Sequence, residues 1–204
     1  MDIEQVISSF IVLWAVIDPV GTVPVFLAVT KRFSKAEKNR IAATATIMSL
    51  LVLMFFLIVG EMLLQNLGVP LSAFQVSGGL ILLLFALSMI FGSSKPEDEI
   101  AMARSEKETA IFPLAMPSIA SPGAILAVIL LTDNSRHSIL EQVVVAGLIA
   151  LILTTTYFLM QSSDRIFTLI GNSGAIIISK IMGMVLASIA STNILLGIKD
   201  FFKI

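Results

Sequence analysis

The sequence of 204 residues contains no cysteine and only one histidine, His137. Disulfides and thiolate metal sites are therefore excluded, and a single imidazole is too few for a zinc centre built on nitrogen ligands. Charge is scarce as well, because Lys, Arg, Asp and Glu make up 13% of the residues and the formal net charge is -1. There is no basic stripe of the kind that binds nucleic acid. We expect no cofactor, no bound metal and no nucleic-acid partner.

Apolar residues dominate the composition. They make up 57% of the chain, and the mean hydropathy is +1.00, whereas a soluble domain has about 45–50% apolar residues. The apolar runs are long enough to cross a hydrocarbon core of about 30 Å, which takes about 20 helical residues. The sequence predicts an all-α membrane protein, surrounded by membrane lipid, with six transmembrane helices at 4–29, 39–65, 71–92, 111–131, 139–161 and 174–198.

The basic residues are distributed unevenly between the two sides of these spans. Nine lie in the loops after the first, third and fifth spans: Lys31, Arg32, Lys35, Lys38, Arg40, Lys95, Arg104, Lys107 and Arg165. Three lie on the opposite side: Arg136, Lys199 and Lys203. Because cytoplasmic loops retain positive charge, we predict that both termini lie outside. The expected location is the inner membrane of the cell. The first residues lack the basic region of a signal peptide, so the first apolar run is expected to remain as a span.

Two of the predicted spans carry helix-breaking residues near their middle. The first contains Asp18-Pro19-Val20-Gly21, and the fourth contains Ser121-Pro122-Gly123-Ala124. Proline inside a helix removes a backbone hydrogen bond, and glycine weakens the helix further. An Asp or Ser followed by proline is also the order of a helix N-cap and the first helical position. We predict that both spans are interrupted, that each restarts as a half-helix at mid-membrane, and that a cavity separates the two breaks.

The matching breaks also predict an internal repeat within a single domain, 1–204. The first repeat covers about 1–95 and the second about 108–204. Three spans per half is an odd number, so the two halves would have opposite orientations in the membrane.

The chemistry of such breaks suits a small charged solute. A half-helix N-terminus offers free N–H groups and the positive end of the helix dipole to a carboxylate. Asp18 is the acidic residue near the bilayer centre, where a charge costs at least about 2.5–3.5 kcal/mol on insertion scales. It is a candidate proton acceptor or partner for a substrate ammonium, and a purely capping role stays open. The predicted substrate-binding residues are Asp18, Pro19, Val20, Gly21, Ser121, Pro122, Gly123 and Ala124, together with Gln75, Ser77 and Gly78 of the third span. Close helix packing is the commoner explanation of such a third-span cluster.

These residues carry a family resemblance. The segment Asp18-Pro19-Val20-Gly21-Thr22-Val23-Pro24-Val25-Phe26 resembles the helix 1 signature of the MarC family, which includes SnatA-type neutral amino acid transporters. The segment from Phe112 to Ile125 is similar to the helix 4 signature. The resemblance implies a permease for glycine, alanine and similar small amino acids, coupled to a proton or cation gradient. The chain departs from the signature at Asp18, where the family commonly has asparagine, and at Ser121, where it commonly has glycine.

The sequence leaves three classes of function open. The leading one is a secondary active transporter that works by alternating access, with Asp18 as the coupling residue. The second is a channel, or an exporter of another small solute. An intramembrane enzyme is disfavoured, because no predicted span contains a histidine and no Gly-x-Ser-x-Gly or His-Glu-x-x-His pattern is present. We therefore expect a protein that is not an enzyme.

Overall fold

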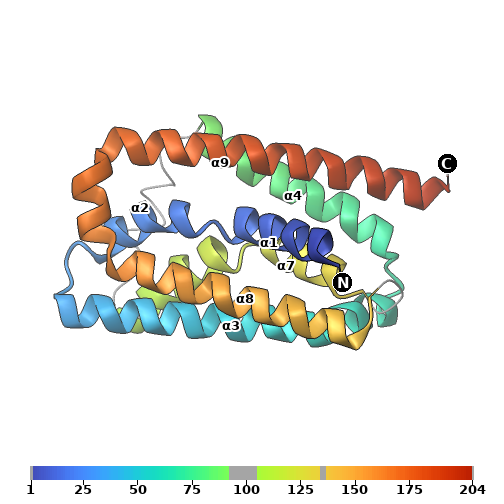
Figure 1. Cartoon of the computed structure of the whole chain (residues 1–204), viewed down its shortest axis with the longest axis horizontal. Coiled ribbons are helices and arrows are strands. Elements are labelled where there is room, and N and C mark those ends of the chain that lie inside the picture. Colours follow the sequence, from blue (N-terminus) through green and yellow to red (C-terminus); the bar gives the residue numbers. More distant parts are fainter. Residues whose placement is uncertain (1, 92–104, 134–136, 204) are drawn as a thin grey trace.

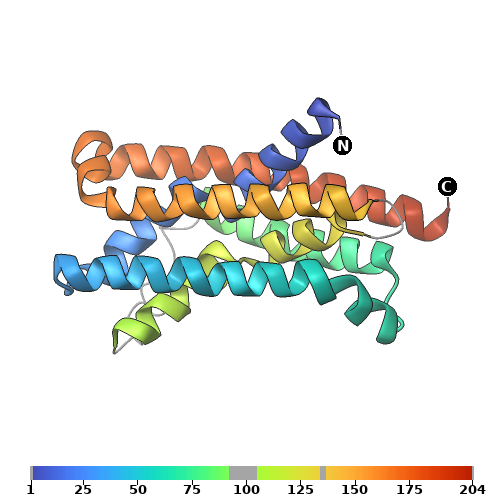
Figure 2. The ribbon, with the colours of Figure 1, turned by 60° about the horizontal axis from the view of Figure 1, so that its bottom comes forward.

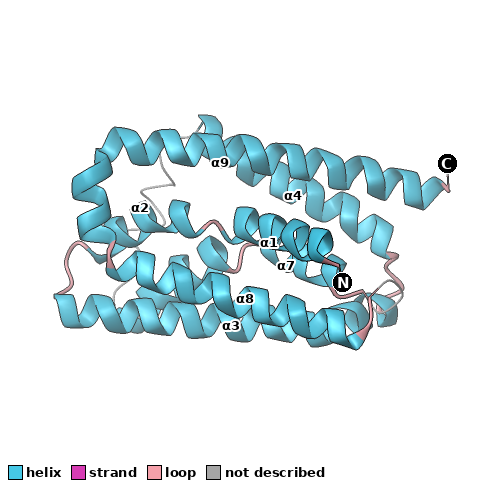
Figure 3. Ribbon diagram, in the orientation of Figure 1, coloured by secondary structure: helices cyan, strands magenta, loops and turns pink. Residues whose placement is uncertain are grey.

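The computed structural model describes residues 2–91, 105–133 and 137–203, and all regular structure in these ranges is helical (Figure 3). The all-helical prediction is confirmed. The last residues of the first predicted repeat, 92–95, lie outside the described residues. The elements, in chain order, are α1 (Ile3–Ile17), α2 (Pro19–Thr30), α3 (Lys35–Asn66), α4 (Leu71–Phe91), α6 (Glu106–Thr109), η1 (Ala110–Ile119), α7 (Pro122–Leu131), α8 (Ile139–Gln161) and α9 (Ser163–Phe202).

Five helical stretches of the described ranges are long and apolar enough to cross a bilayer. They are Ile3–Thr30, Lys35–Asn66, Leu71–Phe91, Ile139–Gln161 and Gly183–Phe202. The pair Glu106–Ile119 and Pro122–Leu131 passes the same test with a bend of 55° between its parts, which makes up to six spans. The chain is therefore a multi-pass membrane protein, as predicted.

Helices α3 and α9 start earlier than predicted, and local capping explains the first of them. Helix α3 begins at Lys35 and not at residue 39, because Ser34 and Glu37 cap each other: the Ser34 N–H donates to the Glu37 carboxylate at 2.6 Å. Such a reciprocal capping box satisfies two amides at the helix start. Helix α9 begins at Ser163 and not at residue 174, but its axis turns at Gly171, whose φ of 67° is readily adopted only by glycine. The prediction thus found the part of α9 that follows the turn.

The helices form one bundle with both chain ends at the same end of it (Figures 1 and 2). Helices α4 and α9 pack along each other, as do α3 and α8, while α1, α2, η1 and α7 lie between these pairs. Small residues allow the α4–α9 contact to be close. A Cβ on Gly79 would lie 2.8 Å from Ile194 Cγ1, and one on Gly183 would lie 3.0 Å from Met89 Cβ.

The contacts of the central elements follow a crossed pattern. Helix α1 packs on α7, and α2 packs on η1. Helix α2 also contacts α8 and α9, while α7 contacts α3 and α4. The hydrophobic core lies along these contacts, and its fully buried members include Leu13, Ile17, Leu114, Ile119 and Ile149. The middle of the bundle is therefore built from the ends of short helices.

Candidate functional site

The first break lies at Asp18, which ends α1 and caps α2. Asp18 has left-handed backbone angles, φ 52° and ψ 66°, which aspartate tolerates better than most residues. Its carboxylate accepts a hydrogen bond from the Gly21 N–H at 2.9 Å, and its carbonyl accepts one from the Thr22 N–H at 3.0 Å. Only 5% of the residue is exposed. A buried carboxylate therefore sits on the N-terminus of α2.

Gly21 is required by this cap. A Cβ on Gly21 would lie 1.9 Å from one carboxylate oxygen of Asp18, far inside van der Waals contact. The carboxylate could not stay on the Gly21 N–H beside any larger side chain. The spacing of aspartate, proline and glycine in the sequence therefore encodes a specific local geometry.

The second break repeats this arrangement at Ser121. Ala120 leaves helical geometry with φ -84° and ψ 65°, and Ser121 then caps α7. The Ser121 hydroxyl accepts a hydrogen bond from the Ala124 N–H at 3.0 Å, and its carbonyl accepts one from the Ile125 N–H at 3.0 Å. The two caps thus use the same positions relative to their prolines.

The segment before the second break is itself irregular. Element η1 is a π-helix in which Phe112 and Met116 have extended backbone angles. Each of them precedes a proline, Pro113 or Pro117, and a residue before proline is disfavoured in the helical region. A hydroxyl of a neighbouring helix reaches this backbone, because Ser49 of α3 donates to the Ala115 carbonyl at 3.4 Å.

The two breaks touch each other. The Ser121 hydroxyl donates a hydrogen bond to the Val16 carbonyl at 3.1 Å, across 105 positions of sequence. Val16 lies in the last turn of α1, where carbonyls have no partner within the helix. Ser121 is fully buried, with 0% exposed. At this point the hydroxyl contacts the facing backbone directly, and the bond satisfies both groups.

The backbone amides of the two half-helix starts are only partly used. Pro19 and Pro122 have no N–H, and the Gly21 and Ala124 amides donate to the caps. Within the part of the chain that the structure describes, no hydrogen bond is found for the amides one position earlier, those of Val20 and Gly123. One donor per half-helix therefore remains for another acceptor.

The predicted residues of the third span divide into two groups. Gln75 and Gly78 lie on the buried face of α4, and a Cβ on Gly78 would lie 2.6 Å from Leu126 of α7. Ser77 is exposed, because positions 75, 78 and 82 follow the period of one helix face and 77 falls outside it. The structure does not bring Ser77 to the breaks.

The sequence reading missed a residue of α4 that lies against the second break. A Cβ on Gly123 would lie 2.3 Å from Cδ1 of Leu82, so the Leu82 side chain covers this glycine. Leu82 is 1% exposed. A single leucine in an apolar run carries no signal that could have identified it. As for metals, no group of three or more His, Asp or Glu side chains gathers among the residues with described positions.

Comparison with known protein families identifies the family of the chain. The model of the MarC family, described as MarC family integral membrane protein, matches residues 3–202. The chain belongs to the MarC family. A UPF0056 membrane protein of Methanocaldococcus jannaschii is 33% identical over 202 residues, covering 98% of both chains. Another from Archaeoglobus fulgidus is 32% identical over 210 residues, covering 98% of this chain and 97% of the relative. One from Buchnera aphidicola is 31% identical over 199 residues and covers 98% of both. No solved structure matches the chain.

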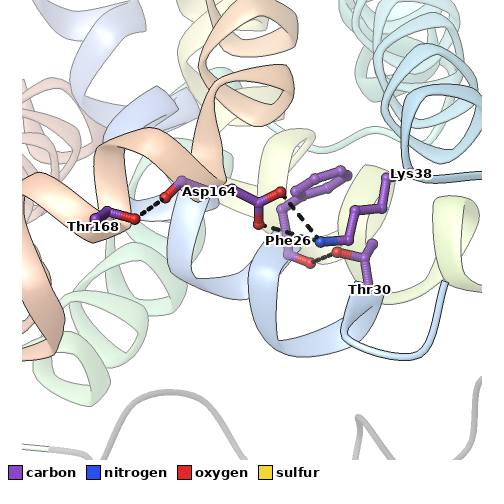
Figure 4. A network of polar contacts seen from close by, with 5 residues as sticks. All are labelled: Phe26, Thr30, Lys38, Asp164 and Thr168. Carbon is purple, nitrogen blue, oxygen red and sulfur yellow. Dashed lines mark hydrogen bonds and ion pairs between the residues drawn. The ribbon is translucent and has the colours of Figure 1, made fainter. Parts of the chain in front are cut away.

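Membership confirms the resemblance drawn from the two breaks, and it shows the chain to be an integral membrane protein. One further contact of this MarC chain was not foreseen. Lys38 of α3 and Asp164 of α9 form an ion pair, with 3.2 Å between Nζ and Oδ1 (Figure 4). The pair joins the helix starts that follow two of the loops predicted to be cytoplasmic. Those two loops therefore lie at the same end of the bundle.

Proposed function

We propose that this MarC protein is a secondary active transporter for small neutral amino acids such as glycine and alanine. Transport proceeds by alternating access at the two breaks, with a proton or cation as the coupling ion. The observation that carries the proposal is the hydrogen bond of 3.1 Å from the Ser121 hydroxyl to the Val16 carbonyl. It joins the N-cap residue of α7 to the last turn of α1, two positions before the buried Asp18 that caps α2.

Two inverted repeats, about 1–95 and 108–204, are the proposed moving units of the single domain. The contacts of the helices support this. Exchanging α1 with η1, α2 with α7, α3 with α8 and α4 with α9 turns the α2–α8 contact into α7–α3, and the α2–α9 contact into α7–α4. It also turns α1–α8 into η1–α3, and all six contacts occur in the fold. Repeats of this kind carry substrates at their interface, near the bilayer midplane.

Asp18 is the proposed partner of the substrate ammonium, directly or through the proton it exchanges. A buried charge in the membrane costs several kcal/mol unless something offsets it, and a cap needs only an oxygen. Asparagine caps helices as well as aspartate does. Capping alone does not require an ionisable side chain at this depth. Coupling to an ion is the function that requires the carboxylate of Asp18.

The substrate carboxylate is proposed to bind the start of α7. The Gly123 amide points from the positive end of a half-helix, which favours an anion. Val20 is its counterpart on α2. Ser121, whose hydroxyl donates to Val16 in this conformation, becomes a second donor when the two breaks separate. Separation of the breaks thus exposes the donors that a carboxylate requires.

Leu82 is the proposed limit on substrate size, because its side chain covers Gly123. Apolar pockets discriminate by about tenfold or more for each methylene that they fail to accommodate. The Leu82→Ala variant should therefore accept larger neutral amino acids, such as valine, better than the wild-type protein does. Competition against labelled glycine uptake measures this, and an unchanged ranking of competitors contradicts the assignment.

The deciding experiment is uptake of labelled glycine and alanine into proteoliposomes across imposed pH gradients. Asp18→Asn should keep the fold, because asparagine both caps and tolerates left-handed angles. It should weaken binding or abolish the pH dependence of uptake. Asp200→Asn, at an exposed position near the end of α9, is the matched control and should behave as wild type. Unchanged affinity and an unchanged pH profile in Asp18→Asn would reduce Asp18 to a cap.

A second pair of variants tests the carboxylate site. Gly123→Ala places a methyl group against Leu82 and beside the proposed donor, and it should abolish or strongly weaken uptake. Gly60→Ala is the control, because it places a methyl group 2.6 Å from the Ile129 side chain of α7, an aliphatic neighbour like Leu82 but away from the breaks. Equal losses in the two variants would indicate general damage to the packing of α7 and would count against the site.

Counterflow distinguishes a carrier from a channel or pore. Liposomes preloaded with unlabelled alanine should accumulate labelled alanine transiently above its outside concentration. A channel cannot support such uphill exchange, so simple equilibration would favour the channel alternative. Membrane lipid and the small substrate are the partners of this proposal, and the inner membrane, with both termini outside, is its location.

A further inference from the structure

A groove on the surface of the bundle lies between α1 and α9, away from the two breaks. Its larger part has a volume of about 530 Å³ and is lined by Glu4, Ile7, Ser8, Ile11 and Val12 of α1, with Val185, Ser188 and Ile189 of α9. A second part of about 310 Å³ is lined by Phe10, Ile11, Trp14 and Ala15, with Val185. The two parts share Ile11 and Val185, so they follow each other along α1. Figure 2 shows the N-terminal end of α1 rising out of the bundle and away from α9.

The length of the groove matches one leaflet of a bilayer. Its lining runs along α1 from Glu4 to Ala15, which spans about 16 Å at a rise of 1.5 Å per residue. Half of a hydrocarbon core of 30 Å is about 15 Å. The groove therefore extends from the end of the span, at the level of lipid headgroups, to mid-membrane. Its deep end lies one turn before the first break, where the Trp14 carbonyl accepts from the Asp18 N–H at 3.0 Å.

The size of the groove favours a lipid chain over a helix as its occupant. An α-helix with its side chains is about 10 Å wide, so a stretch 16 Å long fills more than about 1,000 Å³. This is about twice the volume of the larger part. A helix of a second copy could therefore place only some of its side chains in the groove, whereas a single acyl chain is narrow and apolar along its whole length. Phe10 and Trp14, with ring centroids 5.5 Å apart, add aromatic surface at the deep end.

The charge at the outer end selects the headgroup. Glu4 is the acidic member of the lining, and Asp2 caps α1 beside it through the Gln5 N–H at 2.8 Å. No basic residue pairs with Glu4 in the described ranges. Two carboxylates repel an anionic headgroup and attract a primary ammonium, and the Ser8 hydroxyl of the lining offers an additional hydrogen-bond partner. From these observations we infer that the groove binds one acyl chain of a phospholipid with an ethanolamine headgroup, whose ammonium pairs with Glu4.

The single tryptophan of the chain, Trp14, makes this inference directly measurable. The protein is reconstituted into phosphatidylcholine vesicles that contain increasing fractions of lipid brominated near the end of its chains, which quenches indole fluorescence on contact. Brominated phosphatidylethanolamine should quench Trp14 at about one-fifth of the membrane fraction that brominated phosphatidylcholine needs. That factor corresponds to about 1 kcal/mol, the upper range for an exposed ion pair. Equal quenching by the two lipids contradicts the headgroup assignment.

Two variants and a control separate binding from ordinary contact with bulk lipid. Glu4→Gln should bring the quenching curves of the two brominated lipids together. Val185→Phe fills both parts of the groove and should shift quenching by phosphatidylethanolamine to the curve expected for random mixing. Val143→Phe, on the exposed surface of α8, adds the same bulk elsewhere and should leave the preference intact. A preference that survives Val185→Phe would overturn the site.

A second copy of the chain is the remaining competitor for this face. Ile11 lines both parts of the groove. In the Ile11→Cys variant, a dimer seated on this face would therefore form a disulfide-linked pair under mild oxidation. We expect no such cross-link, together with one phosphatidylethanolamine retained per chain in mass spectrometry of the protein released from detergent. Efficient cross-linking without retained lipid would refute the inference. Neither measurement depends on transport activity, so its outcome is independent of the proposed function.

Discussion

Removing the Ser121 hydroxyl should destabilise the protein well beyond the loss of an ordinary helix cap. The hydroxyl makes two hydrogen bonds, accepting from the Ala124 N–H at 3.0 Å and donating to the Val16 carbonyl at 3.1 Å. Replacing a serine cap by alanine costs about 1 kcal/mol. Leaving a buried carbonyl without a partner costs about 1–3 kcal/mol more. We expect Ser121→Ala to lower the free energy of unfolding by about 2–4 kcal/mol.

A glycine at the same position separates the two contributions. Glycine caps a helix at a cost of only a few tenths of a kcal/mol relative to serine, but it cannot donate to Val16. Ser121→Gly should therefore lose about 1–3 kcal/mol, less than Ser121→Ala by roughly the value of the cap.

The assay is reversible unfolding in mixed detergent micelles, followed by loss of helical circular dichroism. Thr156→Val is the matched control, because Thr156 is fully buried in α8 and its hydroxyl donates to the Ile152 carbonyl of its own helix at 2.8 Å. We expect that control to change stability by less than about 1 kcal/mol, since the Ile152 carbonyl keeps its helical partner. A loss in Ser121→Ala no larger than in the control would show that the bond between the two breaks contributes nothing to stability.

Three further predictions follow from the geometry. Gly21→Ala should destabilise more than Gly123→Ala, because a Cβ meets the Asp18 carboxylate at 1.9 Å in the first case and the flexible end of Leu82 at 2.3 Å in the second; equal melting temperatures would contradict this. Lys38→Met should cost less than about 1 kcal/mol, since the Asp164 side chain is 69% exposed, and the effect should disappear at high salt; a larger, salt-independent loss would point to another role for Lys38. An impermeant maleimide added to intact cells should label Asn66→Cys and not Lys35→Cys, because these exposed residues lie at the opposite ends of α3; the reverse pattern would invert the proposed orientation.

Much of this molecule can be predicted from sequence because the signals are local. Apolar runs of about 20 residues predict membrane helices whatever packs against them. The two caps are equally local, since each bond joins a side chain to an amide three residues later, from Gly21 to Asp18 and from Ala124 to Ser121. The order of Asp or Ser, then proline, coincides with the non-helical backbone angles at Asp18 and Ala120, and it indicated the family.

Only the tertiary structure decided how these local elements meet. The bond from Ser121 to Val16 joins residues 105 positions apart, and nothing near either residue in the sequence specifies the partner. The same holds for Leu82 over Gly123 and for the ion pair of Lys38 and Asp164, because side chains on different helices are brought together by packing alone. Ser77 was assigned to the site from its position in a polar cluster, and the rotation of α4 in the bundle turned it outward. A pattern along the chain defines the faces of a helix, but the neighbours of the helix decide which face is buried.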